Sequence, residues 1–238
     1  MSSSLQKNLG APAQDGGAAE RDLRAAERGL GVANRTSDNL AHGQGKLVII
    51  SGPSGAGKTT LLQRIFQDSP LPLIASISAT TRAPRPGEQQ DRDYHFLSRE
   101  EFAQHRERDE FLESCEVYGQ GDWYGTLRSE VTPSLASGKW VVLEIDVQGT
   151  IRVLQQFTEA VTIFVQPDSL SELERRLRER GTESPAALAR RLDVARHEME
   201  SRSLYRYLVT NDDVERAARE ICEILNQECR NQAGDQTE

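Results

Sequence analysis

Long hydrophobic runs, metal-ligand cysteine patterns and an excess of basic charge are all missing from this 238-residue chain. No apolar run approaches the ~18 residues that a membrane-spanning helix needs, so we expect a soluble protein without a membrane partner. The net charge of −8 argues against a nucleic-acid binder, whose affinity would come from neutralising phosphates. The three cysteines have no metal or redox spacing, and without a signal segment they fit a reducing cytoplasm.

Large apolar residues are scarce near both ends. Residues 1–43 are rich in Ser, Ala, Gly, Gln and Arg, and they cannot bury enough surface to offset the entropy of ordering. We therefore expect a disordered N-terminal tail. The polar residues 231–238 are expected to fray, which leaves residues 44–230 as the folded domain.

Residues 46–62 contain a buried strand that runs into a phosphate-binding loop and then a helix. Gly52, Gly55 and Gly57 allow turns in which successive N–H groups point at phosphate oxygens. Lys58 places a compact charge on the β- and γ-phosphates, and the Thr59 hydroxyl can ligate Mg²⁺. A glycine-rich turn without chemistry is the alternative, but the flanking strand and helix favour a nucleoside triphosphate site.

Around this loop, strands and helices alternate. The runs 47–50, 141–145 and 161–165 are short and apolar, as in parallel strands buried on both faces. Helix starts are indicated by the capping boxes Ser98–Glu101 and Ser169–Glu172, by Ser184 before Pro185, and by Asp212 as a cap. The pattern predicts an α/β fold with a helix-covered parallel sheet. Residues from about 79 to 134 break this rhythm and suggest an inserted substrate-binding region.

Two arginines in that region, Arg82 and Arg85, flank a proline turn. Guanidinium groups at this spacing can fork onto one phosphate, as binding of a nucleoside monophosphate demands. Tyr124 and Thr126 add hydroxyls that could contact the same anion. A solvated surface pair is the alternative, but the neighbouring phosphate loop favours the binding role.

Several motifs occur in a characteristic order. They are Gly-Pro-Ser-Gly-Ala-Gly-Lys-Thr-Thr-Leu, Ser-Ala-Thr-Thr-Arg-Ala-Pro-Arg-Pro-Gly-Glu, Asp-Tyr-His-Phe, Glu-Phe-Leu-Glu, Tyr-Gly-Thr, Glu-Ile-Asp-Val-Gln-Gly, Arg-Gly-Thr-Glu and Thr-Asn-Asp-Asp. The series closely resembles guanylate kinase across roughly residues 46–228. The resemblance implies Mg²⁺-dependent transfer of the ATP γ-phosphate to GMP, giving ADP and GDP in purine nucleotide metabolism. It also implies a three-layer P-loop kinase fold, with a core at 44–78 and 135–230, a GMP-binding region at about 79–134 and a helical lid at about 175–200.

The same resemblance implies a set of site residues. The ATP-binding residues would be Gly52, Pro53, Ser54, Gly55, Ala56, Gly57, Lys58, Thr59, Thr60 and Asn211. The GMP-binding residues would be Ser78, Arg82, Arg85, Glu88, Tyr94, Glu113, Tyr124, Gly125, Thr126, Glu144 and Asp146. Thr59 and Asp146 would hold the metal. Glu113 suits guanine because one carboxylate can accept from both N1–H and the 2-amino group, whereas adenine offers an acceptor at N1.

The lid-like segment carries more arginines than one phosphoryl group needs. We expect Lys58, Arg176, Arg180 and Arg191 to be catalytic, while Arg175, Arg178 and Arg190 could be solvated helix surface; helical register decides between them. Asp146 likewise could be a strand-end cap. The connection between Glu113 and Tyr124 is two residues longer than is usual in the family, which affects the placement of Tyr118, Asp122 and Trp123.

Two other functions fit parts of the pattern. A non-catalytic guanylate-kinase-like module binds protein ligands, but such modules usually have a degraded phosphate loop. A phosphate-sugar kinase of the same fold is the rival enzyme. The presence of Ser78, Glu88 and Glu113 with both arginines favours GMP as the acceptor. The oligomeric state is left open.

Overall fold

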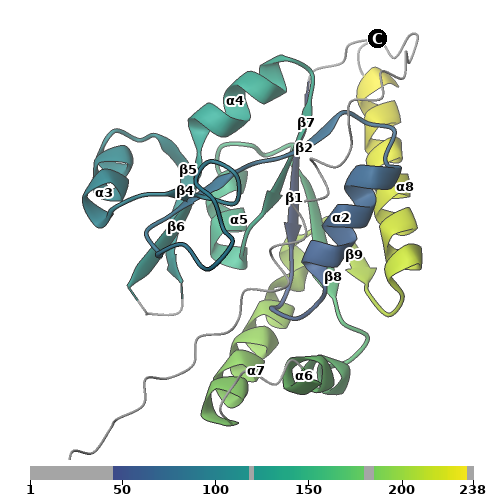
Figure 1. Ribbon diagram of the computed structural model, residues 1–238. Coiled ribbons are helices and arrows are strands. Elements are labelled where there is room, and N and C mark those ends of the chain that lie inside the picture. Colours follow the sequence, from purple (N-terminus) through teal and green to yellow (C-terminus); the bar gives the residue numbers. More distant parts are fainter. Residues whose placement is uncertain (1–44, 118–120, 180–184, 235–238) are drawn as a thin grey trace, which may run out of the picture.

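The computed structural model describes residues 45–117, 121–179 and 185–234 (Figure 1). Its larger sheet has five parallel strands in the order β2–β7–β1–β8–β9. These strands are β1 (Leu47–Ser51), β2 (Leu73–Ala75), β7 (Trp140–Glu144), β8 (Val161–Gln166) and β9 (Tyr207–Thr210). The predicted parallel sheet is confirmed, with β7 shifted by one residue from the expected run. The expected tail, residues 1–43, lies outside the described residues.

Helices cover both faces of this sheet because its strands are apolar on both sides. On one face, α2 (Lys58–Asp68) and α8 (Val214–Gly234) pack on residues such as Ile50, Ile163 and Val209. On the other face, α4 (Arg128–Ala136) and α5 (Val147–Leu154) contribute Val131 and Val153 to a second core cluster. The three-layer arrangement expected of a P-loop kinase is confirmed (Figure 1).

Helix α8 corrects two expectations. Its N-cap is Asp213, whose carboxylate accepts from the backbone N–H of Arg216 at 2.8 Å, so the prediction of Asp212 was wrong by one residue. Asp212 is one position too early for that bond, and its carboxylate instead accepts from the Arg216 side chain. At the other end, α8 continues to Gly234, beyond the point where fraying was expected.

A smaller sheet in the order β4–β3–β6–β5 lies beside the large one (Figure 1). Its strands are β3 (Ser78–Thr80), β4 (His95–Phe96), β5 (Phe111–Val117) and β6 (Asp122–Leu127). Helix α3 (Arg99–Glu107) begins at the predicted capping box of Ser98 and Glu101 and packs on this sheet through Phe102, which stacks on Phe111. The sheet and α3 occupy the region expected to be inserted.

Helices α6 (Leu170–Glu179) and α7 (Pro185–Glu200) pack on each other through Leu173, Leu177 and Ala195. Both lie at the end of the large sheet where β1 finishes, and a 3₁₀ turn, η1 (Ser201–Leu204), leads on to β9 (Figure 1). Ser169 caps α6 as predicted, while the Glu172 carboxylate accepts from two arginines of the same helix. In the described part of the chain, no helix combines the length and the apolar character that crossing a membrane requires.

Candidate functional site

The phosphate loop sits at the carboxyl edge of the large sheet, where a parallel α/β fold collects its ligands. Two of its glycines are required by their surroundings. Gly52 has φ +142°, and a Cβ there would lie 2.0 Å from the Val165 carbonyl oxygen; Gly57 has φ +85°, and its Cβ would lie 2.4 Å from Asn211 Nδ2. A larger residue at either of these two positions would therefore disturb the backbone conformation of the loop.

Lys58 is the first residue of α2, and its ammonium group is held at the loop. Its Nζ donates to the Gly52 carbonyl at 2.7 Å and to the Pro53 carbonyl at 3.4 Å. Glu144, the last residue of β7, lies 4.0 Å from the same Nζ. Three oxygen neighbours thus fix a positive charge beside the N-terminus of α2, which itself attracts anions.

A pocket of about 380 Å³ opens on one side of the loop, a size that suits a small-molecule ligand. It is lined by Gly55, Gly57, Thr60, Arg176, Glu179, Asn211, Asp212 and Val214. Asn211 is 2% exposed and donates to the Ala56 carbonyl at 2.7 Å, so it stabilises the loop as well as lining the pocket.

The arginines of the expected lid fall into two groups according to the helix face on which they lie. Arg176 reaches the Asn211 carbonyl at 3.0 Å, and Arg191 reaches the Ser54 hydroxyl at 2.6 Å, so both lie at the loop. Arg175 and Arg178 are exposed and pair with glutamates of their own helix, and Arg190 is also exposed. Arg180 falls outside the described residues, as does Tyr118.

On the other side, one row of residues crosses the small sheet. Ser78 of β3 is paired with Thr126 of β6, and Thr126 is paired with Glu113 of β5. Paired residues on adjacent strands point to the same face, so these three side chains stand next to one another. Gly125 lies on the opposite face, where a Cβ would be 2.9 Å from the Phe111 ring; its need for glycine comes from packing.

Glu113 is buried, with 6% of its surface exposed, and accepts from the Thr126 hydroxyl at 2.8 Å. Burial raises the pKa of its carboxyl to about 7, and the negative charge of Asp146 acts in the same direction. A methyl group added at Gly149 would lie 3.1 Å from Glu113 Oε2 and 3.3 Å from Asp146 Oδ1. The two carboxyl groups therefore flank the start of α5, and one of them can bind or release a proton near neutral pH.

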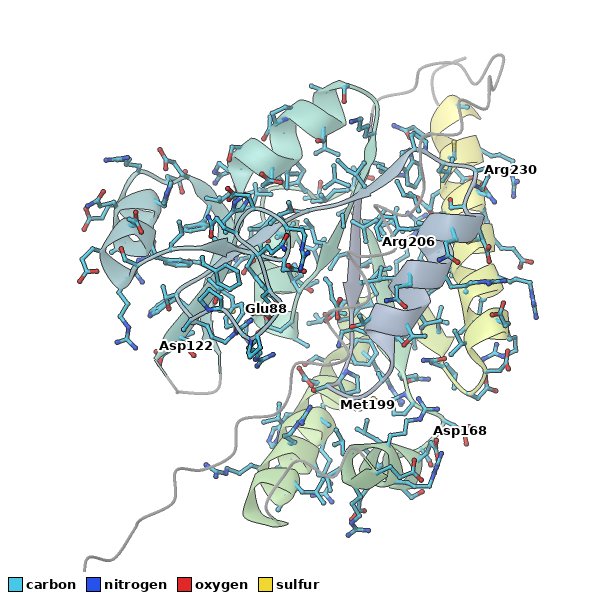
Figure 2. The ribbon with its side chains drawn as sticks, viewed as in Figure 1. Glu88, Asp122, Asp168, Met199, Arg206 and Arg230 are labelled. Carbon is cyan, nitrogen blue, oxygen red and sulfur yellow. The ribbon has the colours of Figure 1, made fainter. Side chains whose placement is uncertain are left out.

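Arg82 is the centre of a second cluster in the same region. Its two Nη atoms each donate to one Glu88 oxygen at 3.0 Å, its Nε lies 3.1 Å from the Tyr124 hydroxyl, and its guanidinium stacks 5.4 Å from the centre of the Tyr94 ring. Figure 2 shows Glu88 at the side of the small-sheet region that is turned toward the large sheet.

Glu88 also accepts from the backbone N–H of Arg85 at 2.7 Å. Burial opposes ionisation of Glu88, but the hydrogen bonds from Arg82 and Arg85 outweigh it and lower the pKa of the carboxyl. Glu88 is thus an ionised group that orients the arginine pair, and guanidinium groups held in this way can bind an anion.

Asp146 caps α5: its Oδ1 accepts from the Gly149 N–H at 2.7 Å, which is the strand-end cap that the sequence left open. Its Oδ2 faces the Cys115 thiol at 3.6 Å. Burial, together with the charges of Asp146 and Glu113, raises the pKa of Cys115 to about 12, so this thiol stays protonated.

Two residues of the site were missed by the sequence analysis. Cys115 is on the same face of β5 as Glu113, a position that strand alternation alone could have indicated. Glu198 of α7 lies near Lys58, Asp146 and the backbone N–H of Ser54. Its spacing of three from the buried Ala195 was the available signal, because residues three apart share a helix face.

The phosphate loop lies at the edge of a parallel sheet, a pocket that includes Arg176 opens beside it, and a second guanidinium group, Arg82, lies in the inserted region. These features define the class: a P-loop kinase acting on small molecules. The family model of guanylate kinase matches residues 44–228. The chain belongs to the guanylate kinase family.

Individual relatives agree with this assignment. The guanylate kinase of Rhodopirellula baltica is 52% identical over 191 residues, which cover 80% of this chain and 91% of that protein. That of Clostridium perfringens is 46% identical, covering 79% of this chain and 86% of the relative. A crystal structure of guanylate kinase from Anaplasma phagocytophilum has a TM-score of 0.63 and 33% identity, with 79% of this chain and 90% of that chain covered.

Proposed function

We propose that this protein transfers the γ-phosphate of ATP to GMP. The observation that carries the proposal is the row of Ser78, Thr126 and Glu113, which places a buried carboxyl beside two hydroxyls on the sheet next to the phosphate loop. Family membership supports the same reaction.

On the acceptor side, Glu113 reads guanine by accepting from N1–H and the 2-amino group, while Ser78 donates to O6. Adenine would leave the buried carboxylate badly paired, which is how such a site discriminates strongly. Arg82 and Arg85, with the hydroxyls of Tyr94 and Tyr124, hold the GMP phosphate, and Glu88 keeps Arg82 in position.

On the donor side, the loop amides and Lys58 bind the ATP phosphates, and the pocket beside Asn211 takes the adenine end. Arg176 and Arg191 neutralise charge on the transferred group. Alignment of two bound nucleotides supplies most of the rate, because phosphoryl transfer needs little covalent help from the protein.

A divalent metal fits the donor set. Thr59 follows Lys58 in the first turn of α2, and Asp146 and Glu144 stand at the end of β7. Among the described residues there is no group of three or more candidate ligands, which suits Mg²⁺ held by one or two protein groups and the phosphates. When bound, the ion neutralises charge on the phosphate oxygens.

The wider assignments follow the same proposal. Residues 44–78 and 135–230 form the core, together with the part of α4 that the sequence placed in the inserted region, because Val131 of α4 packs on the large sheet. The rest of the stretch from about 79 to 134 is the GMP-binding region, and about 175–200 is a lid that excludes water during transfer. A role in purine nucleotide metabolism in the cytoplasm fits three cysteines that are all free thiols.

A coupled assay of ADP formation tests the proposal, with MgATP and with GMP, dGMP, AMP or UMP as acceptor. We expect turnover with GMP, weaker turnover with dGMP, and rates at least about 10³-fold lower with AMP and UMP. A protein that binds GMP without turnover would be a binding module, and turnover with none of the four would contradict the proposed acceptor.

A further inference from the structure

Helix α7 meets the phosphate loop at a single loop residue, Ser54. The Arg191 guanidinium donates to the Ser54 hydroxyl at 2.6 Å. The Glu198 carboxylate lies against the backbone N–H of the same serine. Arg191 and Glu198 are seven residues apart, which is two helical turns, so both project from one face of α7.

Glu198 is an unusual residue to find there. Its Oε2 is buried and has no hydrogen-bond partner within the described residues. Burial raises the pKa of this carboxyl and the charge of Asp146 adds to the effect, whereas Lys58 and the Ser54 N–H favour the ionised form. A buried carboxylate oxygen without a partner destabilises a fold, so packing alone does not account for a glutamate at this position. Groups that disfavour folding and lie beside a phosphate loop are candidates for a role in the reaction.

We propose that Glu198 is a positioning residue for phosphoryl transfer, which together with Arg191 clamps Ser54 and so makes α7 move with the phosphate loop as one unit. The inference rests on the proposed transfer to GMP. Glu198 does not touch the nucleotides; it fixes the loop backbone and, through Ser54, the place of the Arg191 guanidinium relative to the γ-phosphate. Errors of about 1 Å in such an alignment cost up to about 100-fold in rate, so loss of the clamp should reduce turnover more than binding.

The Glu198→Gln variant tests the clamp because glutamine keeps the size and removes the charge and one acceptor. We expect kcat to fall about tenfold or more, with the KM values for ATP and GMP within about twofold of those of the unmodified protein. Glu200→Gln is the matched control: it changes an exposed carboxylate two residues further along the same helix, and we expect no change in kcat or KM. Glu198→Asp keeps the charge on a shorter arm, and we expect an intermediate kcat; it also serves if the glutamine variant folds poorly.

Hydrogen–deuterium exchange of the loop peptide containing Ser54 provides a readout that needs no activity. We expect exchange about tenfold faster in Glu198→Gln than in the unmodified protein, and no change in Glu200→Gln. If the unmodified protein phosphorylates GMP and the Glu198 variants either keep its kcat or leave loop exchange unchanged, the inference is overturned and the proposed function stands. If the unmodified protein does not phosphorylate GMP, the proposed function fails, and exchange alone decides whether the clamp exists.

Discussion

Lys58 and Glu113 are two residues whose surroundings constrain their charge most clearly. Lys58 has three oxygen neighbours, two of them loop carbonyls, so its charge is held at a fixed point. Glu113 is a buried carboxyl whose protonation changes near neutral pH. Each leads to a prediction about one step of the reaction.

Replacing Lys58 by alanine should reduce turnover by about 10²-fold or more, because its charge matters most as the γ-phosphate departs. The fold should persist, since the Lys58 ammonium is partly exposed and contributes no apolar core. Steady-state kinetics and a thermal melt would measure both effects, with Lys139→Ala, a change at an exposed lysine, as the control. Near-normal turnover in a folded Lys58→Ala protein would contradict the role given to the loop.

Glu113 should make GMP binding depend on pH. Only the ionised carboxylate can accept from both guanine donors, so we expect the KM for GMP to rise as pH falls from 8 to 6, by up to about tenfold, while the KM for ATP changes little. In Glu113→Gln, the KM for GMP should be high throughout and this dependence should disappear. An unchanged KM for GMP in that variant would mean that another carboxylate, such as Glu116, reads the base.

The same group affects stability, and the sign follows from its raised pKa. The pKa of the Glu113 carboxyl is about 7 in the folded state, against 4.5 in the unfolded state. The carboxyl therefore contributes its full stabilisation of the fold below about pH 4.5, and this contribution is lost as pH rises through about 7. The loss amounts to about 3 kcal/mol at most. Thermal melts should therefore find Glu113→Gln more stable than the unmodified protein at pH 8, with the difference reduced to about 1 kcal/mol or less at pH 5.

At the scale of elements, the start of α8 shows that only one of two adjacent aspartates acts as the N-cap of the helix. Asp213 accepts from the backbone N–H of Arg216, whereas the neighbouring Asp212 pairs with the exposed Arg216 side chain. Asp213→Ala should lower the free energy of unfolding by about 1 kcal/mol and the melting temperature by about 2–4 °C. Asp212→Ala should cost less than about 0.5 kcal/mol, because an exposed ion pair contributes little. Urea denaturation of both variants would measure the difference, and equal losses would contradict the corrected cap.

At the scale of the whole molecule, the folded domain should not need the first 43 residues. They contain few large apolar side chains, and the first described contacts begin at Gly45, whose N–H donates to the Leu135 carbonyl. Deleting residues 1–43 should leave the melting temperature and the GMP kinase rate unchanged within error. A stability loss of several degrees would indicate that the deleted segment docks on the core, and a loss of rate alone would indicate that it reaches the nucleotide sites.

Much of the fold could be predicted because its signals are local. The apolar runs of β1, β7 and β8, the glycines and Lys58 of the loop, and the capping box at Ser98 each depend on neighbours within a few residues. An ordered series of such motifs also led to the family, which the comparisons confirm. The phosphate-loop chemistry was therefore determined by the sequence itself.

Tertiary structure decided what local patterns leave open. Helical register and the docking of α6 and α7 bring Arg176 and Arg191 to the loop and leave Arg175 and Arg178 on the surface. The pairing of three strands, distant in sequence, is what aligns Ser78 with Glu113. Glu198 reaches Ser54 across 144 positions of the chain, and no short pattern contains both residues. Sequence periodicity indicates which face of a helix or strand is apolar. The partner of a polar side chain depends instead on how separate helices and strands pack together, and this packing exists only in the folded molecule.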